Sequence, residues 1–115
     1  MQKIIDSFLI PYRDKRIALY GTGLNAERVI KLVHGYNFYC TISGETETLD
    51  CKFFGLEVKC LHDVIDDIDV IVIAAIPVSA RAVYDRIKDD IPDSIPVFDL
   101  SGIQMNKPRG YMDMP

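Results

Sequence analysis

Two glycines, Gly21 and Gly23, stand one residue apart between the apolar segment "RIALY" and the amphipathic segment "NAERVIKLV". With Ala26 they fit the pattern G-x-G-x-x-G/A, in which the first glycine permits a tight turn and the second lets a pyrophosphate approach the backbone. The N–H groups at the start of the following helix would then face the anion. The predicted nucleotide-binding residues of this turn are Gly21, Thr22, Gly23, Leu24 and Asn25.

The same glycines have a plainer explanation, in which they only shape a tight joint between a strand and a helix. The pattern is non-specific by itself and gains weight only where a strand precedes it and a helix follows it. Both conditions are met here, because "RIALY" has the character of a buried strand. We therefore favour a ligand-binding role for the glycines over a purely structural one, and keep both interpretations.

The residue expected to meet a ribose is Ser43, at the end of the segment "NFYCTIS". An NAD site usually has Asp or Glu there, roughly 20 residues beyond the glycines, to bind the ribose hydroxyls. A serine replaces two acceptor oxygens with one hydroxyl; Glu45 would substitute if the strand ran further, and Lys52 is the nearest base. The sequence thus favours a phosphate pocket more than it favours NAD or NADP in particular.

A second wall of the site is expected at "AAIPVSAR", which follows the fourth predicted strand. In an open parallel sheet, ligands bind outside the carboxyl ends of the strands where the strand order reverses. Ile76, Pro77 and Ser79 are therefore added to the predicted binding residues, and Arg81 could pair with an anion. The plainer interpretation makes Ser79 an ordinary helix cap and Arg81 a solvated surface residue, and we favour it.

The remaining reactive side chains indicate no reaction. Cys40, Cys51 and Cys60 lack C-x-x-C spacing and favour reduced thiols with a packing role, and His34 and His62 are isolated. Tyr84 and Lys88 form Y-x-x-x-K, which resembles a short-chain dehydrogenase pair, but they follow the fourth strand rather than the fifth. We treat that match as chance, and predict neither catalytic residues nor a metal site.

Composition excludes several classes of protein. The chain has 115 residues, 49% of them hydrophobic, and a net charge of −4, which gives no basic surface for nucleic acid. No apolar run approaches the roughly 20 residues that span a bilayer. The N-terminal segment lacks the cleavage site of a signal peptide, so we expect no membrane insertion and a cytoplasmic location.

Strands and helices alternate along the chain, which predicts a parallel sheet covered on both faces. The fold class is α/β: a doubly wound, five-stranded parallel sheet of order 3-2-1-4-5 with an added N-terminal helix. We expect one domain over 1–115, with its core over about 16–100 and an irregular tail over 101–115. The predicted helices are 2–10, 25–34, 61–68 and 79–90, and the predicted strands are 16–20, 37–43, 56–60, 69–76 and 97–100, with a loop over 44–55.

From Arg16 to about Leu100 the chain resembles the small Rossmann-like domain of bacterial glycan-biosynthesis proteins, such as the N-terminal domain of sugar acyltransferases. The resemblance rests on the G-x-G turn, on "FFGLEV" before the third strand, and on the "P-x-S" helix start. It implies a module that binds a dinucleotide or a nucleotide-sugar without a complete active site. That family often has Asp where this chain has Ser43.

Three functions are therefore carried forward. The first is a nucleotide-binding module whose cofactor is NAD(P) or a nucleotide-sugar, working with a partner domain or as a homo-oligomer. The second is an assembly module with an empty glycine turn. The third, which we favour least, is a stand-alone oxidoreductase. Such domains usually adjoin a partner domain, so we expect either an excised domain or a small independent protein.

Overall fold

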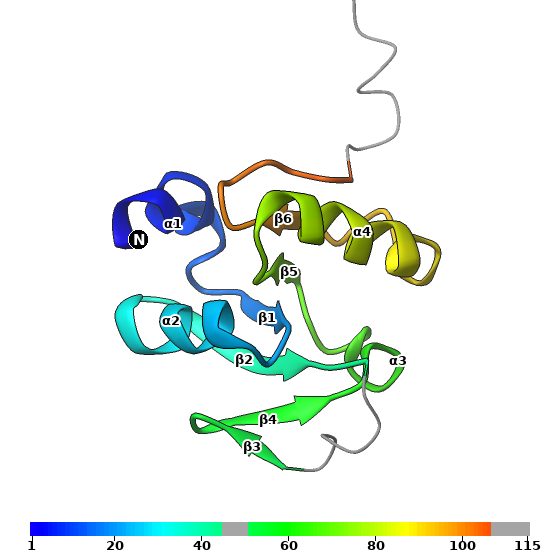
Figure 1. Ribbon diagram of the computed structural model, residues 1–115, viewed down its shortest axis with the longest axis horizontal. Helices are drawn as coiled ribbons and strands as arrows, with labels where there is room; N and C mark the ends of the chain where they lie inside the picture. The colour runs from blue at the N-terminus through cyan, green and yellow to red at the C-terminus, as the bar shows by residue number, and fades with distance from the viewer. Residues whose placement is uncertain (45–50, 107–115) are drawn as a thin grey trace, which may run out of the picture.

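The computed structural model describes residues 1–44 and 51–106, which form a sheet with helices on both faces (Figure 1). The strand order is β3-β4-β2-β1-β5-β6. Neighbouring strands are parallel throughout, except that β3 runs antiparallel to β4. The strands are β1 (Arg16–Tyr20), β2 (Asn37–Ile42), β3 (Lys52–Phe53), β4 (Leu56–Lys59), β5 (Val70–Ile73) and β6 (Val97–Asp99). The predicted doubly wound sheet is confirmed, because the five parallel strands have the expected order.

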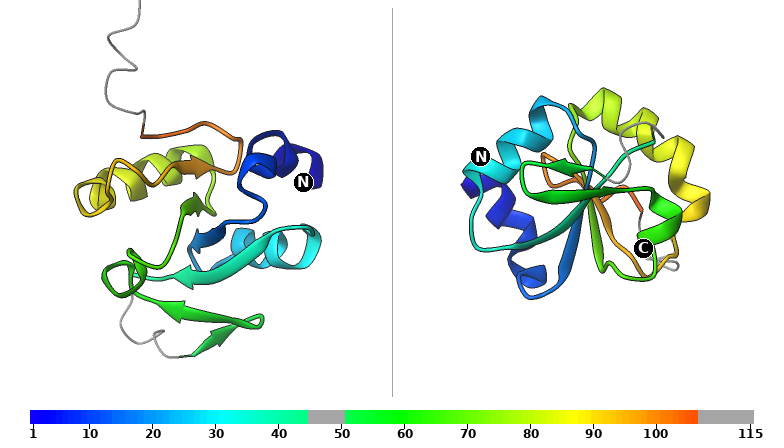
Figure 2. Two further views of the ribbon diagram at one scale, coloured as in Figure 1. Left: turned by 180° about the vertical axis from the view of Figure 1, so that it is seen from behind. Right: turned by 90° about the horizontal axis from the view of Figure 1, so that it is seen from below.

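The helices divide between the two faces of the sheet (Figure 2). Helices α1 and α2 cover one face, and α3 and α4 cover the other. The short 3₁₀ segments η1 and η3 extend α1 and α4. Their bounds are α1 (Gln2–Leu9), η1 (Ile10–Tyr12), α2 (Leu24–Leu32), α3 (Leu61–Val64), α4 (Pro77–Ile87) and η3 (Lys88–Asp90). Among the described residues, no helix is long and apolar enough to cross a membrane.

The apolar pattern of the central strands produces this two-sided core. Ile17 and Leu19 of β1 pack with α1 and α2, whereas Ala18 between them packs with α3 and α4. All four residues of β5 are buried, as expected for a continuous β-branched run between two helical layers.

One irregularity of the sheet was not predicted. Ile17 pairs with Phe38 but the next residue, Ala18, pairs with Cys40, so Tyr39 is an extra residue in β2. This bulge lets Phe38 pack on the α2 side and Cys40 on the other side, although they are two residues apart. Burial raises the pKa of the Cys40 thiol to about 11, which suits packing and not nucleophilic chemistry.

Several predicted boundaries were wrong. Lys52 and Phe53 lie in β3 and not in a loop; a two-residue turn with positive φ at Phe54 (48°) and Gly55 (90°) joins them to β4. Helix α3 ends at Val64, and η1 continues past Pro11. The described part of the predicted tail, residues 101–106, contains no helix or named strand; its Met105 N–H donates to the Val97 carbonyl at 2.8 Å, which covers the outer edge of β6. Residues 107–115 of that tail lie outside the described residues.

A group of hydrogen bonds, which we call the α1 latch, fixes the N-terminal helix to the segment between α2 and β2. The Gln2 amide accepts from His34 N–H at 2.8 Å and donates to the His34 carbonyl at 2.9 Å and to Asp6 Oδ1 at 3.0 Å. The Tyr36 hydroxyl donates to Asp6 Oδ1 at 2.5 Å. Each of these polar side chains therefore has a partner within the latch.

Candidate functional site

The glycine turn lies where the order of the strands reverses. Gly21 N–H donates to the Ile42 carbonyl at 2.8 Å, and Ala74 N–H donates to the Tyr20 carbonyl at 3.0 Å. The turn is therefore bordered by the carboxyl ends of β2 and β5. Gly21 has φ 127°, a conformation that side chains rarely adopt, and a Cβ there would lie 3.6 Å from the Ala74 carbonyl oxygen. The backbone thus requires the first glycine.

The second glycine is not required in the same way. Gly23 has φ −99° and ψ −164°, which any residue adopts, and a Cβ built on it meets no atom within 4 Å. It is the N-cap of α2, its carbonyl accepts from Glu27 N–H at 3.1 Å, and no side chain of the described residues caps the helix. Open space therefore faces the uncapped N-terminus of α2, as a phosphate cradle needs.

Beside the turn is a hollow of about 430 Å³; we call it the ribose hollow because the sequence predicts a ribose at the end of β2, where it lies. It brings together three of the predicted binding residues: Gly21, Thr22 and Ser43. Ser43 is buried, and its N–H donates to the Lys59 carbonyl at 3.0 Å. The described residues that line it are Tyr20, Gly21, Thr22, Ile42, Ser43, Gly44, Arg86 and Ile87.

The other predicted residues do not line this hollow. Leu24 and Asn25 lie in the first turn of α2, and the Leu24 side chain is 61% exposed. Ile76, Pro77 and Ser79 are exposed at the start of α4. None of these five residues is among the described lining of the ribose hollow. Ala74, which directly follows β5, lies next to Gly21.

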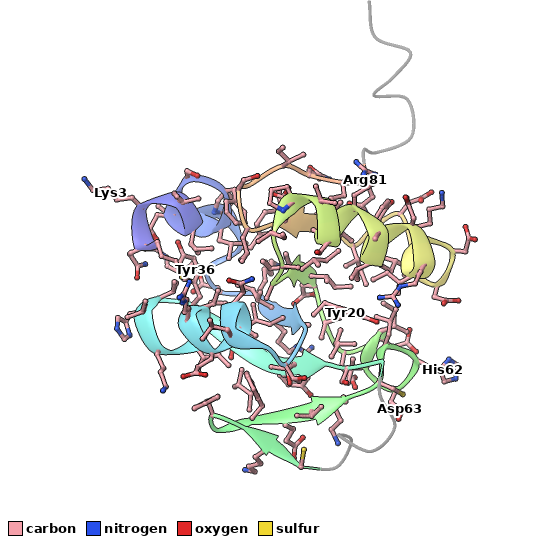
Figure 3. The ribbon with its side chains drawn as sticks, viewed as in Figure 1. Lys3, Tyr20, Tyr36, His62, Asp63 and Arg81 are labelled. Carbon is pink, nitrogen blue, oxygen red and sulfur yellow. The ribbon has the colours of Figure 1, made fainter. Side chains whose placement is uncertain are left out.

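The predicted capping role of Ser79 is wrong. Helix α4 begins two residues earlier, at Pro77, because proline suits the first position of a helix, and Ile76 is the N-cap. Arg81 lies on the exposed side of α4, away from Tyr20 (Figure 3). Its guanidinium is 4.0 Å from Asp85 and lies 5.7 Å from the centre of the Tyr84 ring. These surface contacts agree with the plainer interpretation of Arg81.

Sequence reasoning missed Arg86, which extends from the last turn of α4 into the lining of the ribose hollow. It makes no ion pair or hydrogen bond within residues 1–44 and 51–106. Lys52, the expected nearest base, lies in β3 and lines a different hollow with Glu57 and Lys59. Glu45 lies outside the described residues. The sequence did offer one signal for Arg86. Its neighbour Ile87 belongs to the apolar stripe of the predicted helix, and a buried Ile87 fixes the position of the Arg86 backbone next to the sheet.

Nothing about Tyr84 and Lys88 indicates catalysis. Tyr84 packs against the core beneath α4, and burial is the main cause that raises its pKa. A tyrosine that acts as a base near neutral pH needs the opposite shift. Within the described part of the chain, no group of three or more His, Cys, Asp and Glu side chains is placed to hold a metal ion.

A second hollow, of about 280 Å³, lies between β2, β4 and α3. Three carboxylates, those of Glu57, Asp63 and Asp67, line it together with one amine, that of Lys59. This excess of negative charge is unfavourable for a phosphate, so the ribose hollow is the better candidate for a nucleotide.

The fold is similar to that of UDP-D-quinovosamine 4-dehydrogenase from Vibrio fischeri, with a TM-score of 0.56 over 74% of this chain and 76% of that chain. The fold is Rossmann-like. At 12% sequence identity, the similarity shows the shared fold alone.

Two further solved structures are similar over 78% of this chain at 16% identity. RSP, a Rex-family repressor, has a TM-score of 0.48 with 55% of its chain covered. RSP in complex with beta-NADH has a TM-score of 0.46 with 56% covered. No family model and no curated protein matches the chain.

Proposed function

We propose that this chain is a nucleotide-binding module that holds the phosphates of a dinucleotide or of a nucleotide-sugar at its glycine turn. The observation that carries the proposal is the open space before Gly23 and the uncapped α2, next to the ribose hollow. Neither the backbone angles nor the space at Gly23 requires a glycine, so this open helix start can accept an anion close to its N–H groups.

The chemistry of the surroundings supports a nucleotide. The hollow of about 430 Å³ falls within the range of small-molecule sites, roughly 300–1,000 Å³. Tyr20 supplies an aromatic ring and Ser43 a hydroxyl, and Arg86 supplies a positive charge. Leu24 and Ile76, each 61% exposed, stand at the starts of α2 and α4 as apolar surface for a base.

We further propose a role in bacterial glycan or nucleotide-sugar metabolism, in the cytoplasm, together with a partner domain or a second copy of the chain. The support is the resemblance of "FFGLEV" and of the helix start at Pro77 to the small domains of glycan-biosynthesis proteins. One structure of similar fold is, by its name, a dehydrogenase of a UDP-sugar.

Isothermal titration calorimetry with NAD, NADP, UDP-sugars and acetyl-CoA tests the proposal. We expect at least one of them to bind with a Kd in the micromolar range. Millimolar binding or none, for every member of the panel, would contradict a nucleotide-binding function.

An assembly module with an empty turn is the second candidate, and one observation favours it. Leu24, Ile76 and Val78 are 61%, 61% and 80% exposed, and apolar side chains at one edge of a sheet suit contact with a partner. This alternative predicts a defined oligomer in light scattering and no nucleotide binding. A monomer that binds a nucleotide tightly rules it out.

A further inference from the structure

We infer that the ribose hollow, through Arg86, selects a nucleotide whose ribose carries an additional phosphate group, on its 2′ or 3′ oxygen. This inference rests on the proposed function, because it concerns the far end of the same ligand. The inference narrows the ligand to nucleotides with an additional ribose phosphate, which the glycine turn alone does not specify.

The end of β2 is suited to a second anion. A carboxylate there would bind the two free ribose hydroxyls and repel a phosphate. Ser43 occupies this place, and its side chain carries no charge. The adjacent Gly44 leaves room, since the atom closest to a Cβ built on it is the Tyr20 hydroxyl oxygen at 3.6 Å.

Arg86 supplies the opposite charge. Its guanidinium carries a positive charge and offers donors in a fork that matches two phosphate oxygens. Among the described residues that line the hollow none is acidic, and Arg86 forms no ion pair within residues 1–44 and 51–106. Asp85 precedes it on α4 but is not among the described residues that line the hollow.

The fold fixes the position of Arg86. The next residue, Ile87, is buried in the core beneath α4 and lines the same hollow. The backbone of the last turn of α4 is therefore held beside the end of β2, while the exposed side chain of Arg86 can turn toward a ligand. In this arrangement α4, which follows β5, completes a hollow whose other lining residues lie at the carboxyl ends of β1 and β2.

Two kinds of nucleotide carry this chemistry. NADP has the phosphate on the 2′ oxygen of its adenosine ribose, and coenzyme A has it on the 3′ oxygen. Each has a partner that lacks only that phosphate, NAD in the first case and dephospho-coenzyme A in the second. The two pairs therefore measure the contribution of the ribose phosphate and distinguish its two sources.

The experiment is calorimetric titration of the intact chain, and of the variants Arg86→Gln, Arg86→Lys and Arg81→Gln, with all four compounds. Arg81→Gln is the matched control, because it removes the same charge from the same helix at a residue that is not among the described lining of the hollow and that lies away from Tyr20 (Figure 3). Melting curves of each variant establish that the fold is kept, as expected for exposed side chains.

We expect the wild-type chain to prefer the phosphorylated member of one pair by about tenfold or more, the usual scale for a charge-assisted pair. Arg86→Gln should reduce that preference to about twofold or less, Arg86→Lys should keep part of it, and Arg81→Gln should keep all of it.

Equal binding within both pairs would overturn the inference and leave the proposed function standing. A preference that Arg81→Gln reduces as much as Arg86→Gln would also overturn it, because the charge of the helix as a whole would then be responsible. If none of the four compounds nor any UDP-sugar binds, the proposed function fails and this inference fails with it.

Discussion

The α1 latch and the glycine turn are both polar regions at the ends of helices, but they treat their hydrogen-bonding groups in opposite ways. In the latch, Gln2 both donates to and accepts from the His34 backbone, and Asp6 accepts from two donors. At the turn, the side chain that stands out is Arg86, which has no ion-pair partner among the described residues; the start of α2, like that of α1, receives no side-chain cap from them. Figure 3 shows Tyr36 and Tyr20, one from each region, well apart.

This difference separates polar groups that stabilise the fold from polar groups that remain available to a ligand. Groups that satisfy one another, as in the latch, gain nothing from a third molecule. Donors that face open space gain most from an anion. Substitutions in the latch should therefore change stability without changing binding, and substitutions at Gly23 should do the reverse.

The largest effect on stability is expected at Gly21, the one part of the turn that the backbone requires. Gly21→Ala forces a side chain into φ 127° beside the Ala74 carbonyl, and we expect it to reduce the free energy of unfolding by about 1–3 kcal/mol. Urea denaturation measures this. Gly23→Ala is the matched control and should cost less, no more than about 1 kcal/mol, because its Cβ meets no described atom within 4 Å and only the preference of an N-cap for glycine over alanine is lost. Equal losses in the two variants would mean that both glycines serve the backbone.

A smaller loss is expected in the latch. Tyr36→Phe removes the donor that lies 2.5 Å from Asp6 Oδ1 and leaves the ring against Phe38. We expect the melting temperature to fall by a few degrees, with the affinity for any nucleotide unchanged. A change in affinity, measured by calorimetry, would show that the latch and the site are coupled.

The smallest effect is the pH dependence of the same hydrogen bond. The hydroxyl of Tyr36, followed by the amide of Gln2, lowers the pKa of Asp6 below its ordinary 3.8. The contribution of Asp6 to stability is therefore present above that value and is lost as the pH falls through the lowered pKa.

At the alkaline end the sign is reversed. Burial, and then the bond to Asp6, raise the pKa of Tyr36 from 10 to about 12. Its contribution to stability is present below pH 10 and is lost as the pH rises toward 12. The melting temperature of the wild-type chain, measured across pH, should fall at both the acid and the alkaline end. In Tyr36→Phe, the part of the alkaline fall that comes from ionisation of Tyr36 should be missing. Identical profiles would contradict this account.

The order of the strands could be predicted because it depends on local patterns. Buried β-branched runs such as 70–73 and an amphipathic stripe including Ala26 and Val29 alternate along the chain, and right-handed crossovers leave few topologies. The glycine turn was predictable for the same reason, since Gly21 lies directly between a strand and a helix.

What the sequence did not reveal depends on contacts between distant segments or on local exceptions. The bulge at Tyr39 follows from pairing with β1, and the turn before β4 uses Phe54 at positive φ, where Asn or Gly is usual. Arg86 lines the ribose hollow only because of the direction in which α4 crosses the sheet. Neither the pairing nor the crossing is encoded within a single segment.

The most direct test of the central claim is a melting curve of Gly23→Val and of the wild-type chain, each with and without a saturating nucleotide from the binding panel. The account predicts that the ligand raises the melting temperature of the wild-type chain and leaves that of Gly23→Val unchanged, while the two free proteins melt within a few degrees of each other. A wild-type curve that no nucleotide moves, or a Gly23→Val chain that the ligand stabilises equally, would contradict a phosphate cradle at this turn.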